Sequence, residues 1–386
     1  MKKYLFGAMV VGVAFTSCVN DLEADLTAES KAKPISFEVA KYKASSRAEE
    51  SVLSSTGTSE YPSTGFFGTF GVYAAQRNGE HSVFVNQDST MMQNSKVGFA
   101  NRVWTVLSDT YFWPQTGHVD FVSYSPYSTD VTKVPVVGHV NESAKDYNAL
   151  SFTDYTVTTD DLMYSDKAHL QHHNKVTYHQ SGVPTLFRHA LAKLNFKVEA
   201  SYVISEEKVG ETVKEIHWQV VVKSIKLANI YDKGSLILHT TSPTGTEATT
   251  TQYEIANYNA GDYRVWTRQA SQTSKEWAPA SGQLLTINAT DFSDAINYFV
   301  LPQTFTAGEQ SITITYTISN RVGDGSYDAP TEFTKKLYFD DYDSSVKAWE
   351  MGKNITYTIR IDPKGDVINF DPTVADWEDV NGTLDI

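Results

Sequence analysis

Residues 311–318 read Ser-Ile-Thr-Ile-Thr-Tyr-Thr-Ile, so polar and apolar side chains alternate through the whole stretch. Successive side chains of a β-strand point to opposite faces of the sheet, and this alternation therefore predicts a strand with one face in a core. Further runs that favour strands lie between Gly, Pro, Asn and Asp residues, at 70–74, 119–124, 194–198, 216–222, 224–229, 298–301 and 355–361. No amphipathic helical stretch separates these runs, which predicts an all-β fold of antiparallel sandwiches.

The length of 386 residues predicts two such sandwiches in tandem. Residues 189–193, His-Ala-Leu-Ala-Lys, are the best candidate for a helical turn and lie near the midpoint, so we expect the domain boundary there. The predicted division is a signal peptide at 1–17, a propeptide at 18–47, an N-terminal sandwich at 48–188 and a C-terminal sandwich at 189–386.

The charge balance argues against nucleic acid as a partner. Acidic residues outnumber basic ones by 46 to 32, the net charge is −14, and no cluster of Lys and Arg forms a track for phosphates. The 22 Tyr, 19 Phe and 7 Trp residues favour half-buried pleated surfaces over helices.

The first residues have the pattern of an export signal. Met1-Lys2-Lys3 is a basic start, residues 4–15 are mostly apolar, and the stretch is too short to span a membrane. It ends at Cys18 in a sequence that resembles the lipobox of bacterial lipoproteins, in which the cysteine is acylated and becomes the new N-terminus. Cys18 is also the only cysteine, so an internal disulfide is impossible and lipid attachment explains it better than redox chemistry. The alternative is an ordinary signal peptide with an incidental cysteine.

A single strand is predicted between two polar segments. Ile35, Phe37 and Val39 alternate with polar residues, whereas residues 19–34 and 49–64 are small, polar and without periodicity. A strand in this position can be removed by one cut in the chain without breaking any other predicted element.

Several phrases, in order along nearly the whole chain, resemble the fimbrillin family, the lipoprotein-derived pilins of certain Gram-negative anaerobes. They are Ile35-Ser-Phe37, Ser46-Arg47-Ala48, Phe70-Gly-Val-Tyr73-Ala, Tyr111-Phe-Trp113-Pro114, Val119-Asp-Phe121, Tyr124-Ser-Pro126, Asp161-Leu-Met163-Tyr164, Leu186-Phe-Arg-His189-Ala-Leu191-Ala-Lys193-Leu, Tyr298-Phe-Val-Leu-Pro302-Gln303, Trp349-Glu-Met-Gly352-Lys-Asn-Ile-Thr-Tyr357 and Val374-Ala-Asp-Trp377.

The resemblance implies two transthyretin-like β-sandwiches and a route to a fibre. Family members reach the outer membrane as lipoproteins, and an arginine-specific protease then removes the lipid and the first strand. On this sequence the cut is expected between Arg47 and Ala48, with Lys43 and Arg77 as other sites for a trypsin-like enzyme. A strand of a neighbouring subunit fills the vacancy, and the head-to-tail contact repeats as a surface fimbrium that supports adhesion.

The resemblance places the donor strand near the C-terminus. The candidate covers residues 367–374, with Ile368, Phe370 and Val374 as apolar positions and Trp377 beyond them. Pro372 interrupts this run because proline lacks an amide donor. If the segment cannot donate, the chain can only accept a strand, which would make it a tip subunit and not a stalk subunit.

No catalytic, metal or cofactor site is predicted. The histidines at 169, 172, 173 and 179 lack a helical cap and a Cys or carboxylate partner, so a surface loop is the preferred interpretation. Residues 160–161 and 340–343 contain several Asp residues without a calcium-loop pattern and are expected in turns. His189 is interpreted as a structural histidine bonded to backbone.

Two other functions stay open. A surface glycan-binding lipoprotein would share the export signal, the β-sandwiches and the many aromatic residues, but it would not need the removable strand at 35–39. A secreted hydrolase would need a polar cleft with an acid and a base.

Overall fold

The computed structural model describes 16 segments of the chain, all of them strands, turns and connections. They are residues 33–41, 51–52, 68–77, 90–100, 103–136, 150–165, 168–171, 182–239, 252–254, 263–268, 271–278, 282–287, 290–291, 298–340, 346–364 and 368–376. No helix occurs among these residues, and none of them forms a segment long and apolar enough to cross a membrane as a helix. The prediction of an all-β fold is confirmed.

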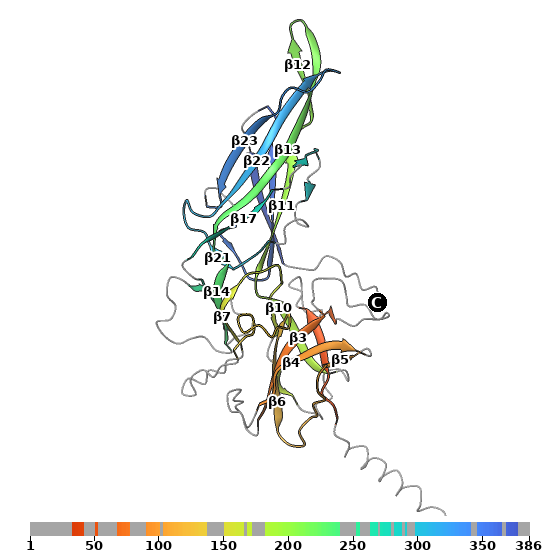
Figure 1. Ribbon diagram of the computed structural model, residues 1–386, viewed down its shortest axis with the longest axis vertical. Coiled ribbons are helices and arrows are strands. Elements are labelled where there is room, and N and C mark those ends of the chain that lie inside the picture. The colour runs from red at the N-terminus through yellow and green to blue at the C-terminus, as the bar shows by residue number, and fades with distance from the viewer. Residues whose placement is uncertain are drawn as a thin grey trace, which may run out of the picture.

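The lower part of the molecule in Figure 1 is a nine-stranded sheet. Its strands are β1 (Phe37–Lys41), β2 (Ser51–Val52), β3 (Thr69–Arg77), β4 (Thr90–Ala100), β5 (Val103–Val106), β6 (His118–Ser125), β8 (Met163–Ser165), β9 (Ala168–Gln171) and β10 (Val183–His189). The order runs β10-β8-β6-β3-β4-β5-β1, and β1 also pairs with β10. The strands therefore form a closed ring in which β1 lies between β5 and β10.

The upper part consists of two facing sheets (Figure 1). One contains β19 (Thr290–Asp291), β11 (Ala192–Ala200), β25 (Lys353–Ile361) and β26 (Ile368–Asp376), with β20 (Tyr298–Val300) beside β11. The other contains β12 (Ile204–Val209), β13 (Thr212–Ile230), β22 (Ser311–Val322) and β23 (Thr331–Tyr338), with β17 (Thr273–Trp277) and β18 (Gln283–Leu284) beside β13. The pairings are mostly antiparallel, and two, β1 with β10 and β11 with β25, are parallel.

A smaller sheet and a two-stranded ladder complete the described strands. The sheet has the order β15 (Gln252–Glu254), β16 (Tyr263–Arg268), β14 (Lys233–His239) and β7 (Ser151–Thr156). The ladder joins β21 (Gln303–Thr304) to β24 (Ala348–Trp349).

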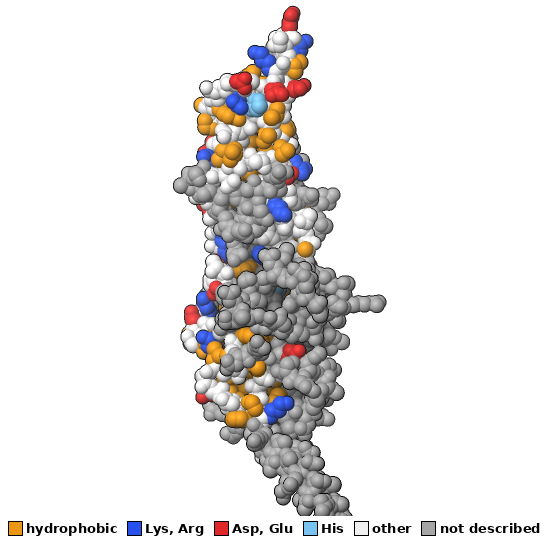
Figure 2. Space-filling view, turned by 90° about the vertical axis from the view of Figure 1, so that its right-hand side faces the viewer, with side chains coloured by type: hydrophobic (Ala, Val, Ile, Leu, Met, Phe, Trp, Pro, Cys, Tyr) orange, Lys and Arg blue, Asp and Glu red, His pale blue; other side chains and the backbone are white. Residues whose placement is uncertain are grey.

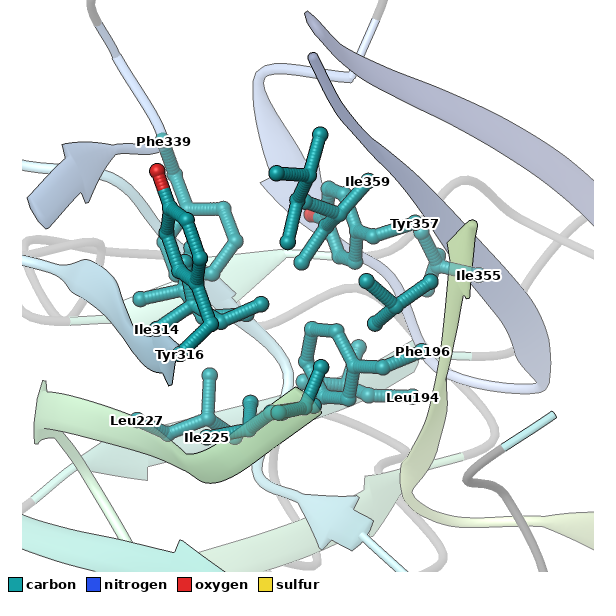
Figure 3. Close-up of a cluster of buried hydrophobic side chains, with 14 of the residues drawn as sticks. Leu194, Phe196, Ile225, Leu227, Ile314, Tyr316, Phe339, Ile355, Tyr357 and Ile359 are labelled. Carbon is teal, nitrogen blue, oxygen red and sulfur yellow. The ribbon is translucent and has the colours of Figure 1, made fainter. Parts of the chain in front are cut away.

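The alternation at residues 311–318 is explained by the upper core. Ile312, Ile314 and Tyr316 are fully buried, whereas Thr313 and Thr315 on the other face of β22 are half-buried. Figure 3 shows side chains of both sheets pointing into the same space, and the labelled residues are Leu194, Phe196, Ile225, Leu227, Ile314, Tyr316, Phe339, Ile355, Tyr357 and Ile359. At the surface, Figure 2 shows hydrophobic side chains over the upper half of the molecule and charged ones at its tip.

The predicted helical turn at residues 189–193 is wrong. His189 ends β10, residues 190–191 form a bend, and β11 begins at Ala192. The bend is held by backbone hydrogen bonds from Ala190 N to Leu162 O (2.8 Å) and from Gly352 N to Leu191 O (2.9 Å). Residues just before β8 and β25 thus bind the peptide groups that a helix would bind internally.

The described residues form three hydrophobic cores, and one of them contains residues from both sides of this bend. The lower core takes its residues from 35–187 and the upper core from 192–361. A middle core, which includes Tyr155, Trp266 and Met351, takes residues from both sides of the bend. The boundary between residues 188 and 189 therefore stays a prediction.

Candidate functional site around the first strand

The three apolar side chains of the first strand point into the lower core. Ile35, Phe37 and Val39 are only 2%, 2% and 1% exposed. The Phe37 ring lies edge-on to Phe70 and to Phe121, with centroid distances of 5.7 and 5.8 Å and interplanar angles of 88° and 90°. Edge-to-face pairs of this kind stabilise beyond their buried area. The strand is therefore an integral part of this core.

The backbone of the first strand is bound on both sides. Five residues, Phe37 to Lys41, pair in parallel with Val183 to Phe187 of β10. Upstream of β1, Ile35 N donates to Tyr111 O (2.8 Å) and Trp113 N donates to Lys33 O (3.0 Å). We call the backbone edges and rings that hold residues 33–41 the β1 seat.

The two sides of the β1 seat differ. β10 contacts β1 along its whole length, but β5 pairs with it only at one position, where Phe37 lies opposite Trp104. β2 pairs with β1 at the other end, opposite Ala40 and Lys41. Loss of β1 would therefore leave the edge of β10 without a partner over five residues.

The candidate donor strand lies at a sheet edge. β26 pairs in antiparallel register with β25 from Ile368 opposite Ile361 to Asp376 opposite Lys353. Val374 is 48% exposed although its register partner Ile355 is buried. Pro372 lies opposite Tyr357 within the ladder. The segment is thus a strand, as predicted, but one that is bound to its own chain.

Cys18, Arg47, Ala48 and Trp377 lie outside the described residues, and so do the side chains of Ile368 and Phe370. Their roles stay predictions.

His189 has a partner that the sequence did not indicate. Its Nδ1 atom lies 2.8 Å from Oδ2 of Asp161, and both side chains are almost fully buried. Asp161, which was expected in a turn, is 3% exposed and lies two residues before β8. Asp160, in contrast, lies at the surface, 3.6 Å from Lys133.

The other predicted polar groups do not converge. Oδ2 of Asp340 accepts a hydrogen bond from Gly308 N (3.0 Å), which fits a turn. Histidines 172, 173 and 179 and Asp residues 341 and 343 lie outside the described residues. Within the described part of the chain, no three His, Cys, Asp or Glu side chains lie close enough to hold a metal ion.

Gly182 is a site residue that sequence reasoning missed. It immediately precedes β10, and its φ is +154°. A Cβ atom here would lie 2.6 to 2.8 Å from the C, N and Cα atoms of Phe37, which is closer than real Cβ contacts come. A glycine before a strand is common, so only the tertiary contact reveals its role.

Known proteins were compared with the chain. Residues 67–377 match the sequence profile of the fimbrillin-like family. A fimbrial protein of Bacteroides vulgatus has a similar structure, with 15% identity, a TM-score of 0.51, and alignment over 89% of this chain and 99% of that one. A protein of Bacteroides uniformis, provisionally classed as a cell adhesion protein, has 18% identity and a TM-score of 0.42 over 89% and 98% of the two chains.

The tip fimbrial protein Mfa3 of Porphyromonas gingivalis also matches, with 8% identity, a TM-score of 0.29, and alignment over 80% of this chain and 94% of that one. No curated protein sequence matches the chain. The likeness to the Bacteroides vulgatus protein supports the fold, and the profile match covers most of the chain. The chain therefore belongs to the fimbrillin-like family, a family of fimbrial subunits and not of enzymes.

Proposed function

We propose that this chain is the precursor of a surface fimbrial subunit that assembles by strand exchange. A lipid on Cys18 anchors it to the outer membrane, and an arginine-specific protease cuts between Arg47 and Ala48. β1 then leaves, and a strand of a second copy, with β26 as the candidate, takes its seat. The fibre carries the adhesive function of the family.

The observation that carries this proposal is the position of β1. It closes the ring of the lower sheet, and Phe37 and Val39 within it and Ile35 just before it are buried, yet among the described strands it is the first in the chain. Residues 42–50, which include Arg47, connect it to β2. One cut in that connection separates β1 from the remaining described strands without breaking any of them.

After the loss of β1, the binding of another strand in the β1 seat is favoured in free energy over leaving the seat empty. Three side chains of this size contribute about 1.5 to 3 kcal/mol each when buried, and each ladder hydrogen bond adds about 1 kcal/mol net. A cut chain that lost β1 would lose both the apolar burial and the ladder hydrogen bonds. A strand with a similar apolar alternation would restore both contributions. Such an association would dissociate very slowly.

The position of a subunit in the fibre depends on β26. To act as a donor, β26 must break its hydrogen-bonded ladder with β25 and bind in the β1 seat of a neighbouring subunit. The exposed Val374 supports this step, because burying it elsewhere gains free energy that the present position does not provide. If β26 stays on β25, the chain accepts a strand without donating one and would lie at the tip.

The test is limited digestion of the purified precursor with an arginine-specific protease. The proposal predicts a new N-terminus at Ala48, release of the preceding segment, and a ladder of oligomers on an unheated gel. Arg47→Lys keeps the charge but resists this protease, so it should stay monomeric. Cleavage at Ala48 that yields only monomers over a wide concentration range contradicts assembly by this chain alone and favours a tip or glycan-binding role.

A further inference from the structure

Gly182 lies directly against the backbone of Phe37 in β1. The atoms that a Cβ would meet are all backbone atoms of Phe37, so no side-chain rotation could relieve the contact. The positive φ of +154° adds a second reason for glycine at this position. Any strand in the β1 seat must therefore bring its own backbone against Gly182.

Other contacts fix the strand at this same level. Val183 N donates a hydrogen bond of 2.8 Å to Ser36 O, directly after Gly182. Phe37 is the single residue that pairs with both β10 and β5, opposite Val183 and Trp104 respectively. Its ring fills the space between Phe70 and Phe121. The β1 seat therefore restricts its occupant most at the level of Phe37. A residue at this level must have a large aromatic side chain and a backbone that packs against Gly182.

The candidate donor strand repeats the pattern of β1. Residues 35–39 read Ile-Ser-Phe-Glu-Val, and residues 368–372 read Ile-Asn-Phe-Asp-Pro. Both have Ile and Phe two residues apart, a polar residue between them and an acidic residue after the Phe. This alignment places Phe370 at the level of Phe37, and Pro372 at the level of Val39.

This alignment places Pro372 at a level where the strand donates no backbone hydrogen bond to β10. In a parallel ladder, amide groups of alternate residues bind one neighbour. Because Val183 N binds Ser36 O and Phe37 pairs with Val183, the amides of Glu38 and Ala40 face β10, and that of Val39 faces away. A proline at the Val39 level therefore removes no hydrogen bond to β10. A shift by one residue would turn the proline toward β10 and reverse the faces of the strand.

We propose that Gly182 sets the register of strand exchange, so that β26 of a second copy enters parallel to β10 with Phe370 against Gly182. This inference rests on the proposed function and adds to it the register and the residue that enforces it. Asp371 would then take the place of Glu38, which lies opposite Pro184.

Cysteine cross-linking tests the register. An acceptor chain with Pro184→Cys is mixed with a donor chain with Asn369→Cys, Asp371→Cys or Thr373→Cys, and both are cut after Arg47 and then oxidised. The three donor positions alternate onto the same face of the strand, so they differ only in register. Cys18, the only native cysteine, is removed by the cut. Neighbouring strands are about 4.8 Å apart, which suits a disulfide.

The expected result is that Asp371→Cys gives the most covalent dimer, in clear excess over the other two. Equal or stronger cross-linking of Asn369→Cys or Thr373→Cys overturns the proposed register, and so do oligomers that none of the three cross-links. A failure of the unsubstituted chain to form oligomers after the cut would contradict strand exchange itself, which is a different result.

A glycine substitution tests the role of Gly182. Gly182→Ala should slow oligomer formation by about tenfold or more, because the added methyl group meets backbone that cannot move aside. Gly210→Ala is the matched control, since Gly210 also has a positive φ (+68°) but no atom lies within 4 Å of its Cβ position. If Gly182→Ala forms oligomers as fast as Gly210→Ala, the proposed role of Gly182 in setting the register is wrong. This holds even if Gly182→Ala is less stable than the unsubstituted chain.

Discussion

β1 and β26 have similar sequences but different surroundings. β1 lies between β10 and β5 and closes a ring, whereas β26 has a single described neighbour, β25, at the edge of its sheet. The apolar side chains at 35, 37 and 39 are buried, whereas Val374 is half exposed. The difference shows that a position between two strands buries apolar side chains, whereas a position at a sheet edge leaves Val374 partly in solvent. Under the proposed function, a strand that moves from such an edge to the β1 seat gains buried apolar area.

The largest effect is expected at Phe37. Phe37→Ala removes a fully buried ring between Phe70 and Phe121 and should lower the free energy of unfolding by about 3 to 5 kcal/mol. Urea unfolding of the uncut precursor, followed by tryptophan fluorescence, measures this loss. A loss below about 1 kcal/mol would mean that the seat collapses around the gap and that β1 is not a tight part of the lower core.

A middle-sized effect is expected in the upper core beside β26. Trp349 Nε1 donates a hydrogen bond of 2.8 Å to the hydroxyl of Tyr357, which lies opposite Pro372 in the ladder. Tyr357→Phe leaves this buried N–H without its partner and should cost about 1 to 3 kcal/mol. Trp349→Phe in the same background should then add little from the hydrogen bond, which a double-mutant cycle measures. Additive losses would show that the bond contributes nothing.

Alkaline pH should weaken the lower half through Tyr124. Burial raises the pKa of Tyr124 to about 12, against the partly offsetting effect of hydrogen bonds with Ser128 and Asn94. The unfolded chain releases this proton near pH 10. The stabilisation is therefore complete below pH 10 and is lost as the pH rises towards 12. Urea midpoints of Tyr124→Phe should decline less between pH 10 and 12 than those of the unsubstituted chain, and parallel declines would contradict this.

The smallest effect is expected on β26. Val374→Ala should change the free energy of unfolding by about 0.5 kcal/mol or less, because the side chain is 48% exposed. Its register partner Ile355 is buried, so Ile355→Val should cost more, about 0.5 to 1.5 kcal/mol. If Val374→Ala costs as much as Ile355→Val, β26 is held more firmly in its own sheet than its edge position indicates.

Local pattern predicted some of the strands, such as β22 and β25, but gave no sign of others, such as β4 and β23. The alternation at Ile35, Phe37 and Val39 predicted the inward side chains, because a period of two depends only on the chain itself. The helical turn predicted at residues 189–193 is a bend at residues 190–191. Ala, Leu and Lys favour helices, but Leu162 and Gly352, which bind the backbone of the bend, are distant in sequence.

Long-range pairing was beyond sequence reasoning. Nothing near residue 37 indicates that β10, almost 150 residues later, is its parallel neighbour. The same separation in sequence hid the contact between Gly182 and the backbone of Phe37. His189 and Asp161, 28 residues apart, form a buried pair for which neither residue alone provides a signature.

The most direct measurement of the central claim is competition for the β1 seat. The precursor is cut after Arg47 in the presence of an excess of a synthetic peptide with the sequence of residues 33–41, and the products are separated by size. The account predicts that this peptide keeps the cut chain monomeric, whereas a peptide with serine in place of Ile35, Phe37 and Val39 lets oligomers form. Oligomers in equal amount with either peptide would contradict it.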